Sequence, residues 1–447
     1  MATPARQAAF EILLRVETES SYATELLHGP LTAKLPEREA ALCTELVLGS
    51  LRWQGTLDFL AQSLSEGSWE RFDPEVRVAL RLGLYQLRFL SRMPARAAVN
   101  ESVGLVKEAG KSSAAGLVNA VLRKGGEVEL ARLRPAGMLD LDWWSVETAH
   151  PAWLLARWIE RYGREQALEM ARANNQAPKS FLRLNTAPLD SAQITEQVLV
   201  EGIEVRRGNF LRTSLRVESG NIARTHAYRR GIVVVQDEAS QIVPHLLDVQ
   251  PGQRLLDLCA APGNKTGLLA QWAGPNGLVV ACDIHLHRLR QFTPPPPRTH
   301  VRRVALDGER PVPFAAEFDC ILVDAPCSGT GTLRRNPELK WRLKPSEITA
   351  MAQKQLRLLD SAAHALKHGG RMVYSTCSLE QEENQDVVDT FLETHTDFRL
   401  LPVREDIVRL RPFFHPAAER LLVGEYLETS PARDALDGFF AAILVRS

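Results

Sequence analysis

Residues 255–270 read LLDLCAAPGNKTGLLA, and this stretch decides the fold class of the C-terminal half of the chain. The short apolar run 255–258 predicts a strand, Pro262-Gly263 predicts a tight turn, and a helix is expected to begin near Thr266. Further apolar runs follow, with helical stretches between several of them, at 278–281, 301–306, 320–323, 372–374 and 439–445. Short apolar strands that alternate with helices indicate a parallel sheet buried on both faces. The sequence therefore predicts an α/β domain here.

The N-terminal part shows a different pattern, because its apolar residues recur with helical periodicity through the first 125 or so residues. Asp73-Pro74 is typical of a helix start, and a second helix after Pro94 is expected to stop at Gly110. This pattern predicts a helical bundle. Between bundle and α/β domain, a helix at 150–163 and strand-like runs such as 181–185 and 231–235 predict a small α/β module, of about 80 residues, a marginal size for a core.

Composition sets limits on the class of protein. The 447 residues exceed one ordinary domain, and 45% apolar with 24% charged residues is typical of a soluble globular protein. The N-terminus lacks the apolar segment of a signal peptide and no run is long enough to span a bilayer, so we expect a cytoplasmic protein without a membrane partner. Because the net charge is +0, any nucleic-acid footprint must be local.

The six cysteines include no CxxC pair, which argues against a zinc site. Cys259, Cys282 and Cys320 lie in or beside apolar runs and are interpreted as packing residues. His285 and His287 have no third ligand nearby, so no metal site is predicted.

Acidic residues end three successive strands of the predicted sheet, where ligands bind in open α/β folds. These are Asp257, Asp283 and Asp307. Asp283 follows Gly263 at a distance suited to ribose hydroxyls, and Asp307 could accept from an exocyclic amine such as that of adenine. Each acid alone is more often a cap, but three together favour a nucleoside pocket. The missing GxGxxG argues against a classical dinucleotide site.

Two later loops each carry a cysteine. In residues 318–342, Asp324 ends a strand and Cys327 lies in a turn, whereas Cys377 follows the strand at 372–374 and precedes an acidic helix start. A helix N-terminus favours the thiolate and neighbouring acids oppose it, so the residues alone do not choose between the two thiols. A run of basic residues after Cys327 would suit a phosphate backbone, although such runs usually form a solvated loop. The run comprises Arg334, Arg335, Lys340, Arg342 and Lys344.

Four motifs together resemble the Sun family of RNA 5-methylcytosine methyltransferases. They are AAPGNKT (260–266), VDAPCSGTG (323–331), NPELKW (336–341) and YSTCSLEQEEN (374–384). The N-terminal part is similar to the NusB domain fused to one branch of that family. The resemblance implies an all-α NusB-like domain over 1–128, linker helices with a small α/β RNA-binding module over 140–230, and a Rossmann-like S-adenosylmethionine methyltransferase domain over 231–447.

The resemblance also implies a reaction and its residues. Carbon 5 of a cytosine in 16S rRNA would be methylated through a covalent cysteine–cytosine intermediate, by a protein expected to be monomeric. Cys377 would be the nucleophile, Cys327 would assist product release, and Asp324 would lie at the junction of cofactor and base. Asp283 would contact the ribose of S-adenosylmethionine and Asp307 its adenine. Further cofactor contacts are implied for Cys259, Ala260, Ala261, Pro262, Gly263, Asn264 and Lys265.

The chain departs from the family pattern at four places. Asn264 replaces a usual second glycine, and Asn tolerates positive φ better than most residues. The other departures are Cys320, the run Pro294–Pro297, and TSPARDALDGFF at 429–440. The alternatives are a DNA cytosine methyltransferase, a NAD-dependent oxidoreductase, a non-catalytic NusB-like RNA-binding or antitermination protein, and a 5-methylcytosine methyltransferase acting on another RNA.

Overall fold

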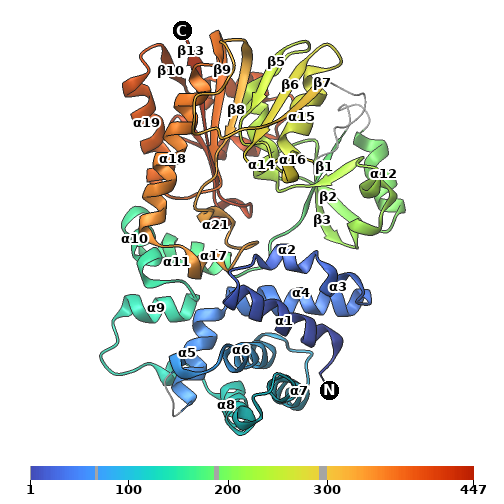
Figure 1. The fold of residues 1–447 in the computed structure, drawn as a ribbon, viewed down its shortest axis with the longest axis vertical. Coiled ribbons are helices and arrows are strands. Elements are labelled where there is room, and N and C mark those ends of the chain that lie inside the picture. The colour runs from blue at the N-terminus through green and yellow to red at the C-terminus, as the bar shows by residue number, and fades with distance from the viewer. Residues whose placement is uncertain (1, 66–68, 186–190, 291–299) are drawn as a thin grey trace. The chain divides into compact units, whose positions relative to one another are not determined.

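The structure is a computed structural model that describes residues 2–65, 69–185, 191–290 and 300–447. It divides into two compact units (Figure 1). The helical unit comprises Met1–Ala177 with Leu333–Leu343, and the sheet unit comprises Pro178–Thr332 with Lys344–Ser447. The expected loop at Pro294–Pro297 lies outside the described residues.

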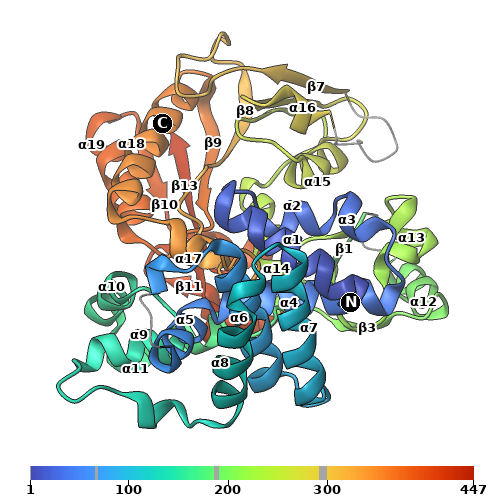
Figure 2. The same ribbon diagram turned by 60° about the horizontal axis from the view of Figure 1, so that its bottom comes forward.

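The described part of the helical unit contains helices and no strands, as predicted, and Figure 2 shows its longer helices side by side. Its α-helices are α1 Pro4–Thr18, α2 Ala23–Leu27, α3 Pro30–Ala33, α4 Glu37–Arg52, α5 Gln54–Leu64, α6 Pro74–Phe89, α7 Ala95–Glu108, α8 Ala115–Glu127, α9 Asp140–Thr148, α10 Ala152–Tyr162, α11 Arg164–Asn174 and α17 Leu339–Arg342. Helix α6 begins with Pro74 directly after Asp73, and α7 ends just before Gly110, whose φ is 79°. The apolar stripes of α6 and α7 pack into one hydrophobic core.

The sheet unit contains a small antiparallel sheet in the order β2-β3-β1-β4. Its strands are β1 Phe181–Leu184, β2 Glu204–Arg207, β3 Ser214–Ser219 and β4 Val233–Val235. Leu182 and Leu184 point to one face of β1 and pack with Ile194 and Val198 of helix α12 (Ser191–Val200). Strand β4 follows residue 230 in the chain and pairs with β1. The expected limits at 128, 140 and 230 remain a prediction.

The larger sheet has nine strands, in the order β11-β12-β13-β9-β8-β5-β6-β7, with β10 paired to β13. The strands are β5 Arg254–Asp257, β6 Leu278–Asp283, β7 His300–Ala305, β8 Phe318–Asp324, β9 Leu366–Thr376, β10 Phe398–Leu401, β11 Leu422–Val423, β12 Tyr426–Thr429 and β13 Phe439–Arg446. Strands β5 to β9 are parallel, as predicted. The prediction of a parallel sheet does not hold for the strand at 439–446. Strand β13 pairs antiparallel with β9, and three more antiparallel strands extend the sheet beyond it.

Both faces of the central strands are buried, as expected. Leu255 and Leu322 belong to one hydrophobic cluster, whereas Leu256 and Val323 belong to the cluster on the opposite face. Helices α15 (Asn264–Ala273), α18 (Pro345–Ala363) and α19 (Gln385–Thr394) belong to the same unit. Strand β7 is the exception, because it ends the sheet and exposes four of its six residues. Among the described helices of either unit, none combines the length and apolar character that crossing a membrane requires.

Candidate active site

A cavity of about 420 Å³ lies at the carboxyl ends of the parallel strands. Seven of the predicted site residues line it, from the loops that follow all five parallel strands: Cys259, Ala261, Asp283, Asp307, Asp324, Cys327 and Cys377. The volume is in the range of ligand-binding pockets. Ile284, beside Asp283, also lines the cavity and is 58% exposed, so the wall includes an uncovered apolar surface next to a carboxylate.

The turn between β5 and α15 supplies one wall. The main-chain nitrogen of Ala261 donates to Asp283 Oδ2 at 3.1 Å, and Gly263 has φ 103° just before α15 begins at Asn264. Asn264 is therefore the first residue of α15. The replacement of the family's usual second glycine by Asn264 does not require a positive φ at this position. Ala260, Pro262, Gly263, Asn264 and Lys265 do not line the cavity itself.

The small sheet supports this turn through Arg183, a residue that the sequence interpretation missed. Its buried guanidinium donates to Gln236 Oε1 at 2.6 Å and to the carbonyl of Asn264. Burial lowers the pKa of Arg183 to about 10. An arginine in an apolar strand is the signal that could have identified it, because a buried guanidinium requires acceptors.

Two strand-end acids hold main-chain donors at the rim. Asp283 Oδ1 accepts from the nitrogen of His285 at 2.8 Å, and Asp307 Oδ1 accepts from the nitrogen of Glu309 at 3.1 Å. Each carboxylate is thereby fixed with lone pairs to spare, because a carboxylate accepts about four hydrogen bonds.

The third strand-end acid, Asp257, was expected in the same pocket, and this expectation is wrong. Asp257 is buried, accepts from Thr266 Oγ1 at 2.7 Å, and does not line the cavity. Burial raises its pKa to about 7. Its place among the cavity acids is taken by Asp324.

Asp324 is fixed from two sides. The ammonium group of Lys265 lies 2.6 Å from Asp324 Oδ2, and Ser375 Oγ donates to Asp324 Oδ1 at 2.8 Å. Lys265 thus acts on the site through Asp324. These contacts join the first turn of α15 to the carboxyl ends of β8 and β9.

The two candidate thiols meet in the cavity. Cys327 Sγ and Cys377 Sγ are 3.1 Å apart, although 50 positions separate them in the chain. The pKa of Cys327 is raised well above its ordinary value by the hydrogen bond with Cys377, by burial and by the charge of Glu383. This shift favours the thiol form of Cys327, which is placed to donate to the sulfur of Cys377.

Glu383 holds both thiol loops together, and the sequence interpretation missed this role. Its carboxylate accepts from the nitrogen of Ser328 at 2.8 Å, from Ser328 Oγ, and from Ser378 Oγ at 2.5 Å. Burial raises the pKa of Glu383. The repeated Cys-Ser pair, 327–328 and 377–378, was the available signal. The residues were expected to form a helix start beside Cys377, but α19 begins only at Gln385 after a 3₁₀ turn, so a helix dipole does not act directly on the thiol.

The glycine motif after Cys327 has a packing reason. A Cβ atom on Gly331 would lie 2.1 Å from the carbonyl oxygen of Gly438. The nitrogen of Gly438 donates to the carbonyl of Gly331 at 2.8 Å, and the nitrogen of Gly331 donates to the carbonyl of Cys377 at 3.0 Å. The unusual segment 429–440 therefore supports the thiol loops. Cys282 and Cys320 are buried, as the packing interpretation predicted, whereas Cys259 is half-buried in the cavity wall.

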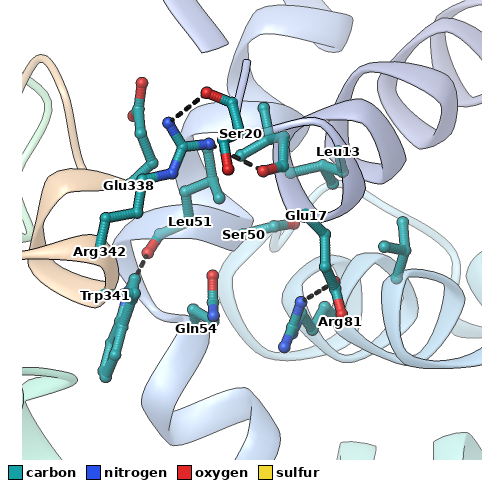
Figure 3. A pocket seen from close by; sticks show the side chains of 12 residues that line it. Leu13, Glu17, Ser20, Ser50, Leu51, Gln54, Arg81, Glu338, Trp341 and Arg342 are labelled. Atoms are coloured by element: carbon teal, nitrogen blue, oxygen red, sulfur yellow. Dashed lines mark hydrogen bonds and ion pairs between the residues drawn. The ribbon is translucent and has the colours of Figure 1, made fainter. Parts of the chain in front are cut away.

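The basic run after Cys327 is largely unavailable to a phosphate backbone, contrary to expectation. Lys340 is fully buried in the helical unit, and its ammonium group donates to the carbonyl of Arg52 at 2.8 Å and to Asn175 Oδ1 at 2.9 Å. Arg342 donates to main-chain carbonyls of residues 16, 20 and 21, and Figure 3 shows its side chain directed toward Ser20. Arg334 is also buried. These charges fasten the segment to the helical unit.

The fold and the cavity define the class of protein. Five parallel strands covered on both faces, with acids and two thiols at their carboxyl ends, form a Rossmann-like domain with a site suited to a nucleoside-containing cofactor. Solved structures agree in fold. The crystal structure of PH0851 matches with a TM-score of 0.81 at 25% identity and full coverage of both chains. A methyltransferase homolog from Pyrococcus horikoshii matches with a TM-score of 0.57 at 25% identity, over 69% of this chain and 100% of that one.

Family models and relatives give the particular family. The model for 16S rRNA methyltransferase RsmB/F matches residues 244–445, the NusB family matches 3–125, and the RsmF/B-like ferredoxin-like domain matches 150–223. The "Probable ribosomal RNA small subunit methyltransferase B" of Bacillus subtilis is 33% identical over 98% of both chains. The ribosomal RNA small subunit methyltransferase B of Pseudomonas syringae is 36% identical over 83% of this chain and 82% of its own.

This chain therefore belongs to the RsmB/F family of 16S rRNA methyltransferases. It is an S-adenosylmethionine-dependent rRNA methyltransferase with a NusB-like helical domain, a ferredoxin-like module and a Rossmann-like catalytic domain. The family resemblance drawn from the motifs is confirmed, and membership decides against an oxidoreductase and against an RNA-binding protein without activity.

Proposed function

We propose that this protein methylates carbon 5 of a cytosine in 16S rRNA through a covalent bond between Cys377 and the base. The observation that carries the proposal is the 3.1 Å separation of the Cys327 and Cys377 sulfurs in the wall of the acid-lined cavity. The names of the relatives support small-subunit rRNA as the substrate. We further propose that the protein acts as a cytoplasmic monomer, with its NusB-like domain helping to orient the RNA.

The cavity residues fit the nucleoside part of S-adenosylmethionine. Asp283 would accept from the ribose hydroxyls, Asp307 from the adenine amine, and the exposed side chain of Ile284 would cover an aromatic face. Cys259 and Ala261, from the turn at 259–265, line the cavity and would lie against the same ligand. When bound there, S-adenosylmethionine supplies an electrophilic methyl group.

Cys377 makes the target carbon reactive. Its thiolate adds to carbon 6 of the cytosine, and the electron pair of the ring double bond becomes available at carbon 5. The base must be unpaired or flipped to reach the sulfur. Asp324, held by Lys265 and Ser375, would accept from the amino edge of the base and orient it.

Cys327 would act at the end of the reaction. After methylation a solvent water takes the proton from carbon 5. The electron pair of that C–H bond re-forms the ring double bond, and the pair of the bond from carbon 6 to Cys377 leaves with the sulfur. The protonated Cys327 thiol donates to the departing sulfur and stabilises it as a thiolate.

The test compares single cysteine variants on unmethylated 16S rRNA. Cys377→Ala should abolish methyl transfer, and Cys327→Ala should accumulate a covalent RNA–protein adduct that survives denaturing electrophoresis. Cys43→Ala, in the buried core of the helical unit, is the control and should turn over normally. Retained turnover in Cys377→Ala would refute the assignment. Bisulfite mapping of rRNA from a strain without the gene would locate the cytosine, and unchanged 16S rRNA would point to another RNA.

A further inference from the structure

A second, larger cavity of about 670 Å³ lies in the sheet unit, away from the thiols. Its walls come from helix α12, from strand β2 with the turn that follows it, and from the segment after helix α20 (Val403–Leu410). Figure 1 shows α12 and strands β2 and β3 together. A neighbouring cavity of about 300 Å³ shares Arg212 and His415 with it, so the two cavities adjoin at these residues and are together called the groove.

Main-chain hydrogen bonds fix the residues of this groove. The nitrogen of Arg212 donates to the carbonyl of Phe413 at 2.9 Å, and the nitrogen of His415 donates to the carbonyl of Phe210 at 2.8 Å. Leu211 and Phe414 form an antiparallel bridge between these bonds. Two segments about 200 positions apart in the chain therefore hold Arg212, Phe413 and His415 in one place before any ligand arrives.

The groove carries uncompensated positive charge. Arg207 and Arg212 are exposed, and neither has an acidic partner among the described residues. Arg206 lies 3.9 Å from Glu218, the length of a weak pair. Glu196 is the single acidic side chain among the described residues that line the larger cavity. Such an excess of arginine favours an anionic ligand.

His415 adds a polar group without a partner. Its Nε2 atom is buried and has no hydrogen-bond partner among the described atoms, although the side chain lines both cavities. Burial and the positive charges of Arg212 and Arg207 lower the pKa of His415. Arg207, Arg212 and His415 all line the larger cavity, so an anion there can contact all three side chains.

We propose that Arg207, Arg212 and His415 bind a backbone phosphate of the RNA substrate, and that Phe413 stacks on an adjacent unpaired base. This inference rests on the proposed action on rRNA. Guanidinium groups match phosphate geometry, and a half-buried aromatic ring beside them is the combination with which proteins hold single-stranded RNA. Phe413 favours RNA over an acidic peptide, which would need no stacking surface.

Phosphate contact predicts a specific salt signature. Arg207→Ala and Arg212→Ala should each weaken binding of a 16S rRNA transcript roughly tenfold, because a charge-assisted hydrogen bond is lost. The slope of log affinity against log salt should fall by about 1 for each variant. Arg212→Glu should weaken binding further. Arg399→Ala, an exposed arginine of β10 outside both cavities, is the matched control and should bind as the parent does.

The stacking role predicts a different signature. Phe413→Leu keeps an apolar side chain against the imidazole of His245, which lies 5.1 Å from the aromatic ring, but removes the stacking surface. It should weaken RNA binding while the salt slope stays unchanged. In turnover, all groove variants should raise KM and leave kcat at saturating RNA near the parent value.

Direct binding separates this proposal from the catalytic one, because filter binding needs no methyl transfer. One outcome is a lower RNA affinity and salt slope in the arginine variants of the groove while the parent protein fails to methylate 16S rRNA. That result would support the groove proposal and refute the proposed function. Parent-like affinity and salt slope in Arg207→Ala and Arg212→Ala, with unchanged melting temperatures, would overturn the groove proposal. That result would leave a free nucleotide or an acidic peptide as the ligand.

Discussion

The carboxylate of Glu383 lies 2.8 Å from the main-chain nitrogen of Ser328 and accepts its hydrogen bond. The same carboxylate accepts from Ser378 Oγ, so one side chain holds the residues that follow both thiols. The distance between the Cys327 and Cys377 sulfurs therefore depends on Glu383, although Glu383 forms no hydrogen bond with either sulfur. Glu383 is a positioning residue.

Removing the acceptor should separate the thiol loops. Glu383→Ala leaves the Ser328 nitrogen without its partner, and we expect kcat to fall roughly a hundredfold with little change in KM, because geometry rather than binding is lost. Glu383→Gln keeps one acceptor oxygen and should recover part of the loss. Glu393→Gln, exposed on α19, is the control. Equal activity of the Ala and Gln variants would argue against positioning.

Substitutions of Asp324 and of its hydrogen-bond donor Ser375 should lower kcat to different extents. Asp324→Asn removes the charge that Lys265 neutralises, and kcat should fall about a hundredfold if the carboxylate accepts from the base. Ser375→Ala removes only the 2.8 Å hydrogen bond to Asp324 and should cost roughly tenfold. Single-turnover methylation measures both. A larger loss in Ser375→Ala than in Asp324→Asn would contradict the assignment.

Asp257 should make the sheet unit less stable as pH rises. Burial raises its pKa from 3.8 to about 7, so the folded chain holds a proton that the unfolded chain has released between these values. The contribution of Asp257 to the free energy of unfolding is fully present below about pH 4. It falls by up to roughly 4 kcal/mol as the pH rises to about 7. Asp257→Asn removes this dependence. Denaturant unfolding at several pH values should show the difference, and parallel stability curves for variant and parent would exclude it.

Lys340 should matter for stability rather than for RNA affinity. Lys340→Ala leaves the carbonyl of Arg52 and the amide oxygen of Asn175 buried without their donor, at a cost of about 3 kcal/mol. Calorimetry should show a lower Tm for the helical unit, whereas Lys34→Ala at an exposed position should leave it unchanged. Weaker RNA binding at an unchanged Tm would restore the phosphate-contact interpretation.

The sequence by itself determined the parallel core and the acidic and thiol residues that meet in the cavity. Apolar runs that alternate with helices fix a parallel sheet, and the carboxyl ends of its strands must share one edge. Asp283, Asp307, Asp324, Cys327 and Cys377 were therefore predictable as neighbours from their positions alone. The family motifs then gave the chemistry.

Only the tertiary structure decided the groups whose state depends on distant partners. Charge, burial and hydrogen bonding are set by atoms far apart in the chain. Lys340 looked like a solvent-exposed cation until its acceptor, 288 positions away, was placed beside it. Packing likewise buries Asp257 away from the cavity and pairs β13 antiparallel with β9. It also places Glu383 where its carboxylate accepts from the residues that follow both thiols. Local pattern encodes the elements and their ends, whereas packing decides which of their polar groups still face a ligand.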